Sequence, residues 1–211
     1  VLFSSCTITV KENKSTKLTG ETVKVTRSCE PFDKITMSGG LDIKYIEDDS
    51  CYVEIEADKA LNAKVSTEVT DGILNIALLQ TSFDGNIFET DDKAQDDRTF
   101  TFHGMKNSID KTLDCDIKVI VHAPYLNEIQ SHGTIDFEAD KVKSQGEFYL
   151  RVSGKSDTKI KRLESRKVEL STSGLSDIEV GIYNADTVGI KSSGKSDLDI
   201  NFQNCGTAHI Q

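Results

Sequence analysis

SGKSDTKI at residues 153–160, SGLSDIEV at 173–180 and SGKSDLDI at 193–200 are copies of one pattern, and SHGTIDF at 131–137 is a looser copy. Their glycines are 21, 20 and 20 residues apart, and an aspartate stands three positions after each glycine. SGGLDI at 38–43 is an earlier copy with the same shape. The repeated turn positions are Gly39, Asp42, Gly133, Asp136, Gly154, Asp157, Gly174, Asp177, Gly194 and Asp197. Such an internal repeat indicates a fold built from stacked, equivalent units.

Apolar residues recur in columns beside these glycines and aspartates. Four positions before the glycine stand Ile35, Ile129, Leu150, Leu170 and Ile190, with Ile210 in a last, partial copy. Three positions after the aspartate stand Tyr45, Ala139, Ile160, Val180 and Ile200. Apolar and polar residues alternate around these columns, which is typical of β-strands. A single unit cannot bury its apolar face, but stacked units form a continuous core.

The sequence therefore predicts an all-β protein, a parallel β-helix with coils of about 20 residues. Leucine-rich repeats have a similar period, but their consensus leucines and asparagine are missing here. The β-branched residues that dominate the columns also favour strands.

The aspartate column would place like charges close together. In stacked strands equivalent residues lie about 4.8 Å apart, where two unit charges repel by roughly 1 kcal/mol in water. We expect each carboxylate to accept backbone N–H groups within its own turn, while the glycine supplies a positive φ. Calcium bridging is an alternative, although it needs about six to eight oxygen ligands and only serine and carbonyl oxygens stand nearby.

The composition is acidic. Lys and Arg number 25 against 35 Asp and Glu, which gives a formal charge of −10 and a pI near 4.9. Nucleic acid is not expected as a partner, because the attraction to phosphate has the wrong sign. No run of residues is as long and apolar as a membrane span requires. The length of 211 residues fits one elongated domain, which we assign to residues 21–211.

Residues 1–20 differ from the rest of the chain. VLF at residues 1–3 is typical of the end of a signal peptide's apolar region, and SSC at residues 4–6 resembles a bacterial lipobox. Cys6 would then be the lipidated first residue of the mature protein, and an ordinary exposed cysteine is the alternative. The Lys-, Thr- and Ser-rich stretch that follows is expected to be a polar tether between the anchor and the folded domain.

The sequence after the tether resembles a known family. PFDKITMSGGLDIKYI at 31–46, YVEIEAD at 52–58, VTDGILNIAL at 69–78 and the later SGxSD repeats are similar in content and order to the GIN-domain family, the auto-transporter adhesin head domains of secreted and lipid-anchored bacterial proteins. The resemblance implies a right-handed β-helix at the envelope of a Gram-negative bacterium, lipid-anchored in the outer membrane. It brings no catalytic residues to this chain.

Residues 64–122 interrupt the repeat and are expected to be an insertion. The spacing between Gly39 and Gly133 is 94 residues, which is not a whole number of coils. In order, the insertion contains a β-hairpin at 64–79 with an Asp71-Gly72 turn, an acidic loop at 82–98, and alternating strands at 98–103 and 115–122 that could pair. The acidic loop lacks EF-hand spacing, so we expect solvated surface there.

Five cysteines are present. If Cys6 carries lipid, four remain, which suits an oxidising compartment. Cys29 and Cys51 are 22 residues apart, about one coil, so stacking could bring them within reach of a disulfide. Cys115 and Cys205 are expected to be apolar fillers.

Motifs that carry catalysis are absent from the sequence. It contains no GxSxG, HExxH, phosphate-binding loop, dinucleotide fingerprint or CxxC, and its four histidines have no second ligand at metal spacing. We therefore expect no enzyme activity, no cofactor and no metal.

Three functions remain open. The leading hypothesis is a non-catalytic binding or adhesion module at the cell envelope that presents a β-helix flank to a glycan or a protein. The second is a structural protein that assembles end to end through unpaired strand edges. The third is a polysaccharide lyase or hydrolase, by analogy with other β-helices, with Asp157, Asp177 and Asp197 as candidate carboxylates. Their regular repetition favours a structural role, because an acid/base pair needs two unlike environments.

Overall fold

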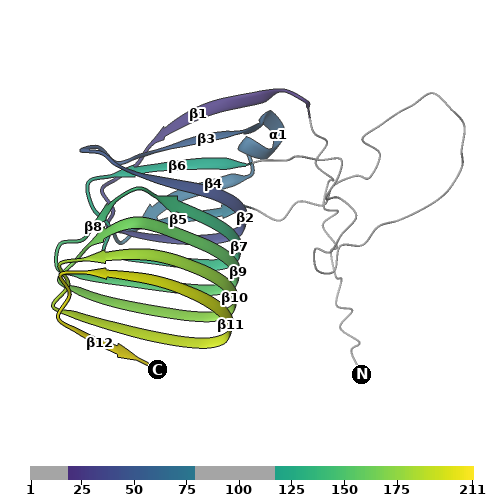
Figure 1. Cartoon of the computed structure of the whole chain (residues 1–211). Coiled ribbons are helices and arrows are strands. Elements are labelled where there is room, and N and C mark those ends of the chain that lie inside the picture. The colour runs from purple at the N-terminus through teal and green to yellow at the C-terminus, as the bar shows by residue number, and fades with distance from the viewer. Residues whose placement is uncertain (1–18, 79–116) are drawn as a thin grey trace, which may run out of the picture.

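The computed structural model describes residues 19–78 and 117–211. In these residues the protein is all-β: twelve strands form one large mixed sheet, accompanied by one short helix (Figure 1). The sheet order is β1-β3-β6-β2-β7-β9-β10-β11-β12, with β4, β5 and β8 attached beside this path. No helix in the described ranges is long and apolar enough to cross a membrane.

The elements of the N-terminal part are β1 (Thr22–Ser28), β2 (Lys34–Glu47), β3 (Tyr52–Asp58), α1 (Lys59–Asn62), β4 (Val65–Thr70), β5 (Ile73–Leu78) and β6 (Lys118–Ala123). The repeat region contains β7 (Glu128–Ala139), β8 (Val142–Lys143), β9 (Glu147–Glu164), β10 (Lys167–Tyr183), β11 (Thr187–Gln203) and β12 (Thr207–Ile210).

The repeat copies lie side by side as parallel strands in register. Strand β2 pairs with β7, β7 with β9, β9 with β10, and β10 with β11, so that each repeat glycine lies opposite the next. The aliphatic column stacks in the same way, in the order Leu74, Ile35, Ile129, Leu150, Leu170, Ile190 and Ile210. Leu74, Ile35, Ile129 and Leu150 are fully buried. The spacing of the repeat thus predicted which residues form the core.

Each long strand runs through its glycine without a break. In β10 the buried residues before and after Gly174 are Val168, Leu170, Thr172, Ser176, Ile178, Val180 and Ile182, all of even number. The backbone at Gly174 has a φ of +117°. The ribbon of β10 curves back on itself in Figure 1. The prediction of a turn between short strands was wrong at this point, because the glycine bends one continuous strand.

The turns that connect successive long strands lie at the opposite edge. Asn184 and Asn204 have φ values of +60° and +54°, and the buried Ala185 lies between Asn184 and Asp186. The N–H of Gly206 donates to the Ala185 carbonyl at 2.8 Å, which joins one turn to the next. We call one long strand with its following turn a rung.

Residues before the repeat region complete the sheet in a different way. The predicted hairpin is present as β4 and β5, with Asp71 and Gly72 both at positive φ. Strand β5 pairs with β2 before Gly39, and β6 pairs with β2 after Gly39, both in parallel. The two short strands together therefore occupy the place of one rung that is split at its bend.

The split coincides with the gap between the two described ranges. A Cβ atom on Gly39 would lie 3.1 Å from Leu78 Cβ, and the N–H of Asp42 donates to the Ile117 carbonyl at 3.2 Å. The chain thus leaves and re-enters beside the same bend of β2. Outside the described residues lie Cys6 with the tether up to residue 18, the acidic loop at 82–98, the strand at 98–103, and Cys115.

Candidate binding surface

The bends form one edge of the sheet, which we call the glycine edge. Gly133, Gly154, Gly174 and Gly194 have φ values from +104° to +117°, which side chains rarely adopt. Each also lies against the backbone of the preceding rung: a Cβ atom on Gly154 would be 2.4 Å from the Gly133 carbonyl oxygen. The repeated glycines are therefore required both by their backbone conformation and by the close stacking of the rungs.

The predicted aspartate column lies beside this edge. The register places Asp42, Asp136, Asp157, Asp177 and Asp197 opposite one another in order. Partial desolvation, followed by the charges of Asp157 and Asp42, raises the pKa of Asp136, while the backbone N–H of Asp157 donates to its carboxylate. At Asp136 this N–H belongs to the next rung, and the prediction that every aspartate of the column accepts N–H groups within its own turn stays a prediction. No group of three or more His, Cys, Asp or Glu side chains in residues 19–78 and 117–211 is arranged to hold a metal ion.

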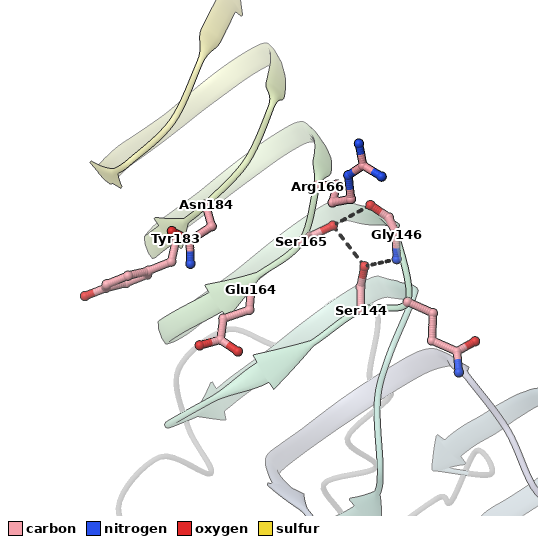
Figure 2. Close-up of a pocket in the computed structure, with 8 residues that line it drawn as sticks. Ser144, Gly146, Glu164, Ser165, Arg166, Tyr183 and Asn184 are labelled. Carbon is pink, nitrogen blue, oxygen red and sulfur yellow. Dashed lines mark hydrogen bonds between the residues drawn. The ribbon is translucent and has the colours of Figure 1, made fainter.

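The opposite edge, which we call the turn edge, carries two adjoining hollows. The first has a volume of about 320 Å³ and is lined by Ser144, Gln145, Gly146, Glu164, Ser165, Arg166, Tyr183 and Asn184 (Figure 2). The second has a volume of about 380 Å³ and is lined by Asp33, Lys34, Asn127, Glu128, Gln145, Gly146, Glu147 and Tyr149. The two hollows share Gln145 and Gly146, so together they form a continuous polar surface across four rungs, those of β2, β7, β9 and β10.

Hydrogen bonds hold the floor of the first hollow rigid. The Ser144 and Ser165 hydroxyls lie 2.9 Å apart, and the Ser165 hydroxyl is within 3.1 Å of the Gly146 carbonyl (Figure 2). The Gly146 N–H donates to the Ser144 hydroxyl at 3.2 Å, and the Arg166 N–H donates to the Gly146 carbonyl at 3.1 Å. These bonds connect successive turns, so the shape of the hollow is set by backbone and short side chains.

The second hollow is organised around Asn127. Its side-chain amide donates to the Asp33 carboxylate at 2.7 Å, and its side-chain oxygen accepts from the Gln145 N–H at 2.9 Å. One amide therefore joins the loop before β2 to the turn before β9. Residues 94 positions apart in the sequence meet at this point of the surface.

A tyrosine with a cation against its ring flanks each hollow. The Arg162 guanidinium lies 4.3 Å from the centre of the Tyr183 ring, and the Arg151 guanidinium lies 5.1 Å from that of Tyr149. Both rings are half-exposed. Partly exposed aromatic rings beside fixed amide and hydroxyl groups are the usual chemistry of a binding surface.

Two carboxylates of the turn edge, Glu147 and Glu164, are paired with cations. The Tyr149 hydroxyl, and then Lys167, lower the pKa of Glu147, while Arg162 lowers that of Glu164 against the effect of burial. Both groups are therefore ionised at neutral pH. A general acid would need a raised pKa, so this arrangement suits ligand binding better than proton transfer.

The two cysteines singled out as a disulfide candidate are neighbours, although not through stacked coils. Cys29 follows β1 and Cys51 precedes β3, and these strands are antiparallel. The Cys29 N–H donates to the Cys51 carbonyl at 3.2 Å. Both thiols, and that of the half-buried Cys205, are free in the structure.

One buried polar group was not distinguished by its sequence. His122 is 6% exposed, and both of its ring nitrogens lack a hydrogen-bond partner. They lie 3.6 Å from an Asp48 oxygen and 3.7 Å from a Glu54 oxygen, and the ring stacks on Tyr52 at 3.9 Å. The alternation of apolar residues in β6 does not specify which residue type stands at this position, so the cluster could not be predicted from the sequence.

The turn-edge residues were also missed in the sequence. The signal that could have found them is the pair Asn184 and Asn204, which stand 20 residues apart and favour positive φ. The amide of Asn204 donates to the Asn184 side-chain oxygen at 3.4 Å, so the asparagines stack as the glycines do.

Residues 31–211 match the family described as "Putative auto-transporter adhesin, head GIN domain". The chain belongs to this family. The GIN-domain resemblance of its sequence blocks is thereby confirmed, and the match spans every rung of the sheet. Among curated proteins, none matches this GIN-domain chain.

Several solved structures are similar to this chain. A "putative adhesin" of Bacteroides fragilis is 14% identical with a TM-score of 0.44, and the match covers 92% of this chain and 99% of that one. A "putative adhesin" of Parabacteroides merdae is 12% identical with a TM-score of 0.44, covering 92% and 98%. A "Putative lipid binding protein" of Parabacteroides distasonis is 13% identical with a TM-score of 0.43, covering 94% and 100%.

Proposed function

We propose that this GIN-domain chain is a non-catalytic binding module of the bacterial cell envelope that uses its turn edge to hold a glycan or a protein. The observation that carries the proposal is the pair of adjoining hollows that share Gln145 and Gly146 and are flanked by Tyr149 and Tyr183. Membership of a family described as adhesin heads supports the same reading.

A neutral glycan is the ligand that this chemistry favours over a charged one. Glu147 is paired with Lys167 at 3.6 Å, and Arg166 with Asp186 at 3.1 Å, so charges on the turn edge compensate one another. The amide of Gln145 and the hydroxyl of Ser144 are suited to sugar hydroxyls. Tyrosine rings at both ends offer apolar surface to a sugar face.

The test is a glycan array followed by calorimetry on any glycan that binds. Tyr149→Ala and Tyr183→Ala should each weaken binding at least fivefold, because truncating an aromatic contact typically costs about 1 kcal/mol or more. Leu175→Ala is the matched control, since this side chain is 55% exposed on the glycine edge. Loss of binding with Leu175→Ala and not with the tyrosine variants would transfer the site to the glycine edge.

The same assay distinguishes binding from hydrolysis or elimination. Any bound glycan is incubated with the protein and its products are separated by mass. Intact glycan after prolonged incubation supports a binding module. Cleavage of the glycan would contradict this proposal and indicate a polysaccharide-active enzyme. If no glycan on the array binds, a protein remains as the candidate ligand.

We further propose that the rungs are coils of a right-handed parallel β-helix and that a lipid on Cys6 attaches the protein to the outer membrane. The parallel register of glycine on glycine supports the first. The lipobox-like sequence before Cys6 supports the second.

A second candidate function is self-assembly, favoured by the last rung. In the described part of the chain, β12 pairs only with Thr187–Ile190 of β11, and no strand covers the rest of β11. Phe202 in this uncovered half is 38% exposed. Open strand edges with apolar side chains favour pairing with another chain. Sedimentation velocity over a range of concentrations tests this: a constant monomer mass discards assembly, and association that Phe202→Asp abolishes supports it.

A further inference from the structure

The structure juxtaposes two thiols at the end of an edge strand. Strands β1 and β3 pair antiparallel from Thr22 with Asp58 to Ser28 with Tyr52. The next opposing pair in this register is Cys29 with Cys51, and the hydrogen bond from the Cys29 N–H to the Cys51 carbonyl continues the ladder. The two cysteines are therefore directly opposed.

Directly opposed residues on antiparallel strands project from the same face of the sheet. Their Cα atoms lie about 4.5–5.5 Å apart, within the roughly 4.4–6.8 Å that a disulfide spans. Cys29 and Cys51 are both half-buried and both pack against the hydrophobic core. The pairing of the backbone is therefore compatible with a cross-strand disulfide, although in this structure the Cys29 thiol donates to the Arg27 carbonyl at 3.6 Å.

Among residues 19–78 and 117–211, the strand that this bond would secure has a neighbour on one side only. Within these ranges β1 ends the sheet and pairs with β3 alone. At its beginning, the Asp58 carboxylate accepts from the N–H groups of Thr19 and Gly20 at 2.9 and 2.8 Å. Near its end, the Arg27 guanidinium donates to the Val65 and Asn62 carbonyls at 2.6 and 2.9 Å. After Arg27, the hydrogen bond at Cys29 is the last contact of the strand with β3.

We propose that Cys29 and Cys51 are a redox site that closes to a disulfide in an oxidising compartment and latches β1 onto β3. One thiolate attacks a small-molecule disulfide such as oxidised glutathione, releasing one glutathione thiol and leaving a mixed disulfide. The second thiolate then displaces the remaining glutathione. Two protein thiols are oxidised and one glutathione disulfide is reduced to two thiols.

The latch would act at the strand that follows the N-terminal segment. A mechanical force applied to the chain before Thr19 acts first on β1, whose hydrogen bonds to β3 can then break one after another. A covalent bond at its far end stops the peeling before it reaches β2. It also closes a loop that contains all of β2, and closing such a loop removes conformational entropy from the unfolded chain.

The environment of Cys29 makes the reaction sensitive to pH. Burial, and then the neighbouring Cys51, raise the pKa of the Cys29 thiol, so its thiolate is scarce at neutral pH. Disulfide exchange proceeds through the thiolate. Closure by glutathione disulfide alone should therefore be faster at pH 9 than at pH 7.

The test uses the full chain, incubated with oxidised or with reduced glutathione. Remaining thiols are alkylated, and the protein is digested with trypsin without reduction. Cleavage after Arg27, Lys34, Lys44 and Lys59 gives two peptides, 28–34 with Cys29 and 45–59 with Cys51. The disulfide is expected to join these two peptides in the oxidised sample only. Unlinked peptides after oxidation, or Cys29 joined to Cys205, would overturn the proposal.

The mechanical role has its own readout. Oxidation should raise the Tm by roughly 5–10 °C, as expected for a loop of this size. Cys205→Ser should keep this difference, while the Cys29→Ser/Cys51→Ser variant should lose it. If the double variant does not fold, the comparison of oxidised and reduced wild-type protein decides alone. A linked peptide pair without any rise in Tm would refute the latch.

Discussion

The carbonyl oxygen of Gly154 lies 2.4 Å from the position that a Cβ atom on Gly174 would occupy. Real Cβ atoms do not approach an oxygen so closely, and the atom in the way belongs to the backbone of the neighbouring rung. Because the glycines of the repeat meet in register, the same contact recurs at Gly133, Gly154 and Gly194. At the glycine edge, direct contact between backbone atoms of successive glycines therefore sets the separation between rungs.

Replacing Gly174 by alanine should destabilise the protein strongly. The substitution combines a φ of +117° with the contact to Gly154, so we expect a loss of about 2–4 kcal/mol in the free energy of unfolding. Gly72→Ala is the control, since Gly72 also has positive φ but its Cβ would meet only an Asp33 oxygen at 3.6 Å. Its cost should be about 1 kcal/mol. Equal losses in urea unfolding would show that conformation, and not stacking, requires the glycines.

Replacing Asp136 by asparagine should stabilise the protein slightly at neutral pH. The folded pKa of Asp136 is raised above its ordinary value of 3.8, so the folded chain binds this proton more readily than the unfolded chain. The unfavourable contribution is absent below pH 3.8 and appears as the pH rises through the folded pKa. Because the carboxylate is exposed, we expect only a few tenths of a kcal/mol.

The measurement for Asp136 is urea unfolding between pH 3 and pH 8. The two proteins should converge at the acidic end and separate toward neutrality. Asp49→Asn, at an exposed position in the loop before β3, should leave the profile unchanged. A less stable Asp136→Asn at pH 7 would mean that the hydrogen bond from the Asp157 N–H outweighs the repulsion.

Removing the Tyr45 hydroxyl should cost stability. It is fully buried and donates to the Ala123 carbonyl at 2.8 Å, so Tyr45→Phe removes one of the two hydrogen bonds that this carbonyl accepts, the other coming from the Asp48 N–H at 3.1 Å. We expect a loss of about 1–2 kcal/mol. Tyr52→Phe should cost less, because the Tyr52 hydroxyl donates to Asp48 at 3.3 Å in a less buried place.

Tyr45 also predicts a loss of stability in alkali. Burial, and then Glu47 and Cys51, raise the pKa of Tyr45 well above its ordinary value of 10.0. The unfolded tyrosine releases its proton first, so wild-type stability falls as the pH rises above 10. Tyr45→Phe should lack this part of the decline. Parallel alkaline curves for the two proteins would contradict the assignment.

Cys6 should carry lipid in the bacterial cells that make the protein. The prediction is that labelled palmitate enters the wild-type protein and that the protein fractionates with membranes. Cys6→Ser should abolish both, while Cys205→Ser should change neither. Finding unmodified Cys6 in the N-terminal peptide from wild-type cells would contradict the proposed lipid anchor.

The sequence predicted stacking well because stacking follows a single period. Glycine over glycine and Leu150 over Leu170 follow from a spacing of 20 residues alone. The continuity of the strands could also have been read, since Thr172 and Ser176 keep the even-numbered alternation across Gly174. It was missed because both residues are polar, and polar residues at a bend look like a solvated turn.

The candidate binding surface was less accessible from sequence. Asn127 and Asp33 meet only because β2 and β7 are parallel neighbours although 94 residues separate the pair. The approach of Cys29 to Cys51 depends on an antiparallel pairing outside the repeat. Neither relationship has a periodic signature, because each depends on how the sheet is completed at its N-terminal end.

The split rung formed by β5 and β6 shows what the architecture tolerates. Its two halves keep their places beside β2 although 39 residues of chain, 79–117, separate them. Lengthening a connection costs little entropy once its ends are fixed. The bends are therefore suitable sites for inserting sequence. A foreign epitope inserted beside Leu175 would be exposed at the glycine edge, while the column of aliphatic side chains in the core stayed in place.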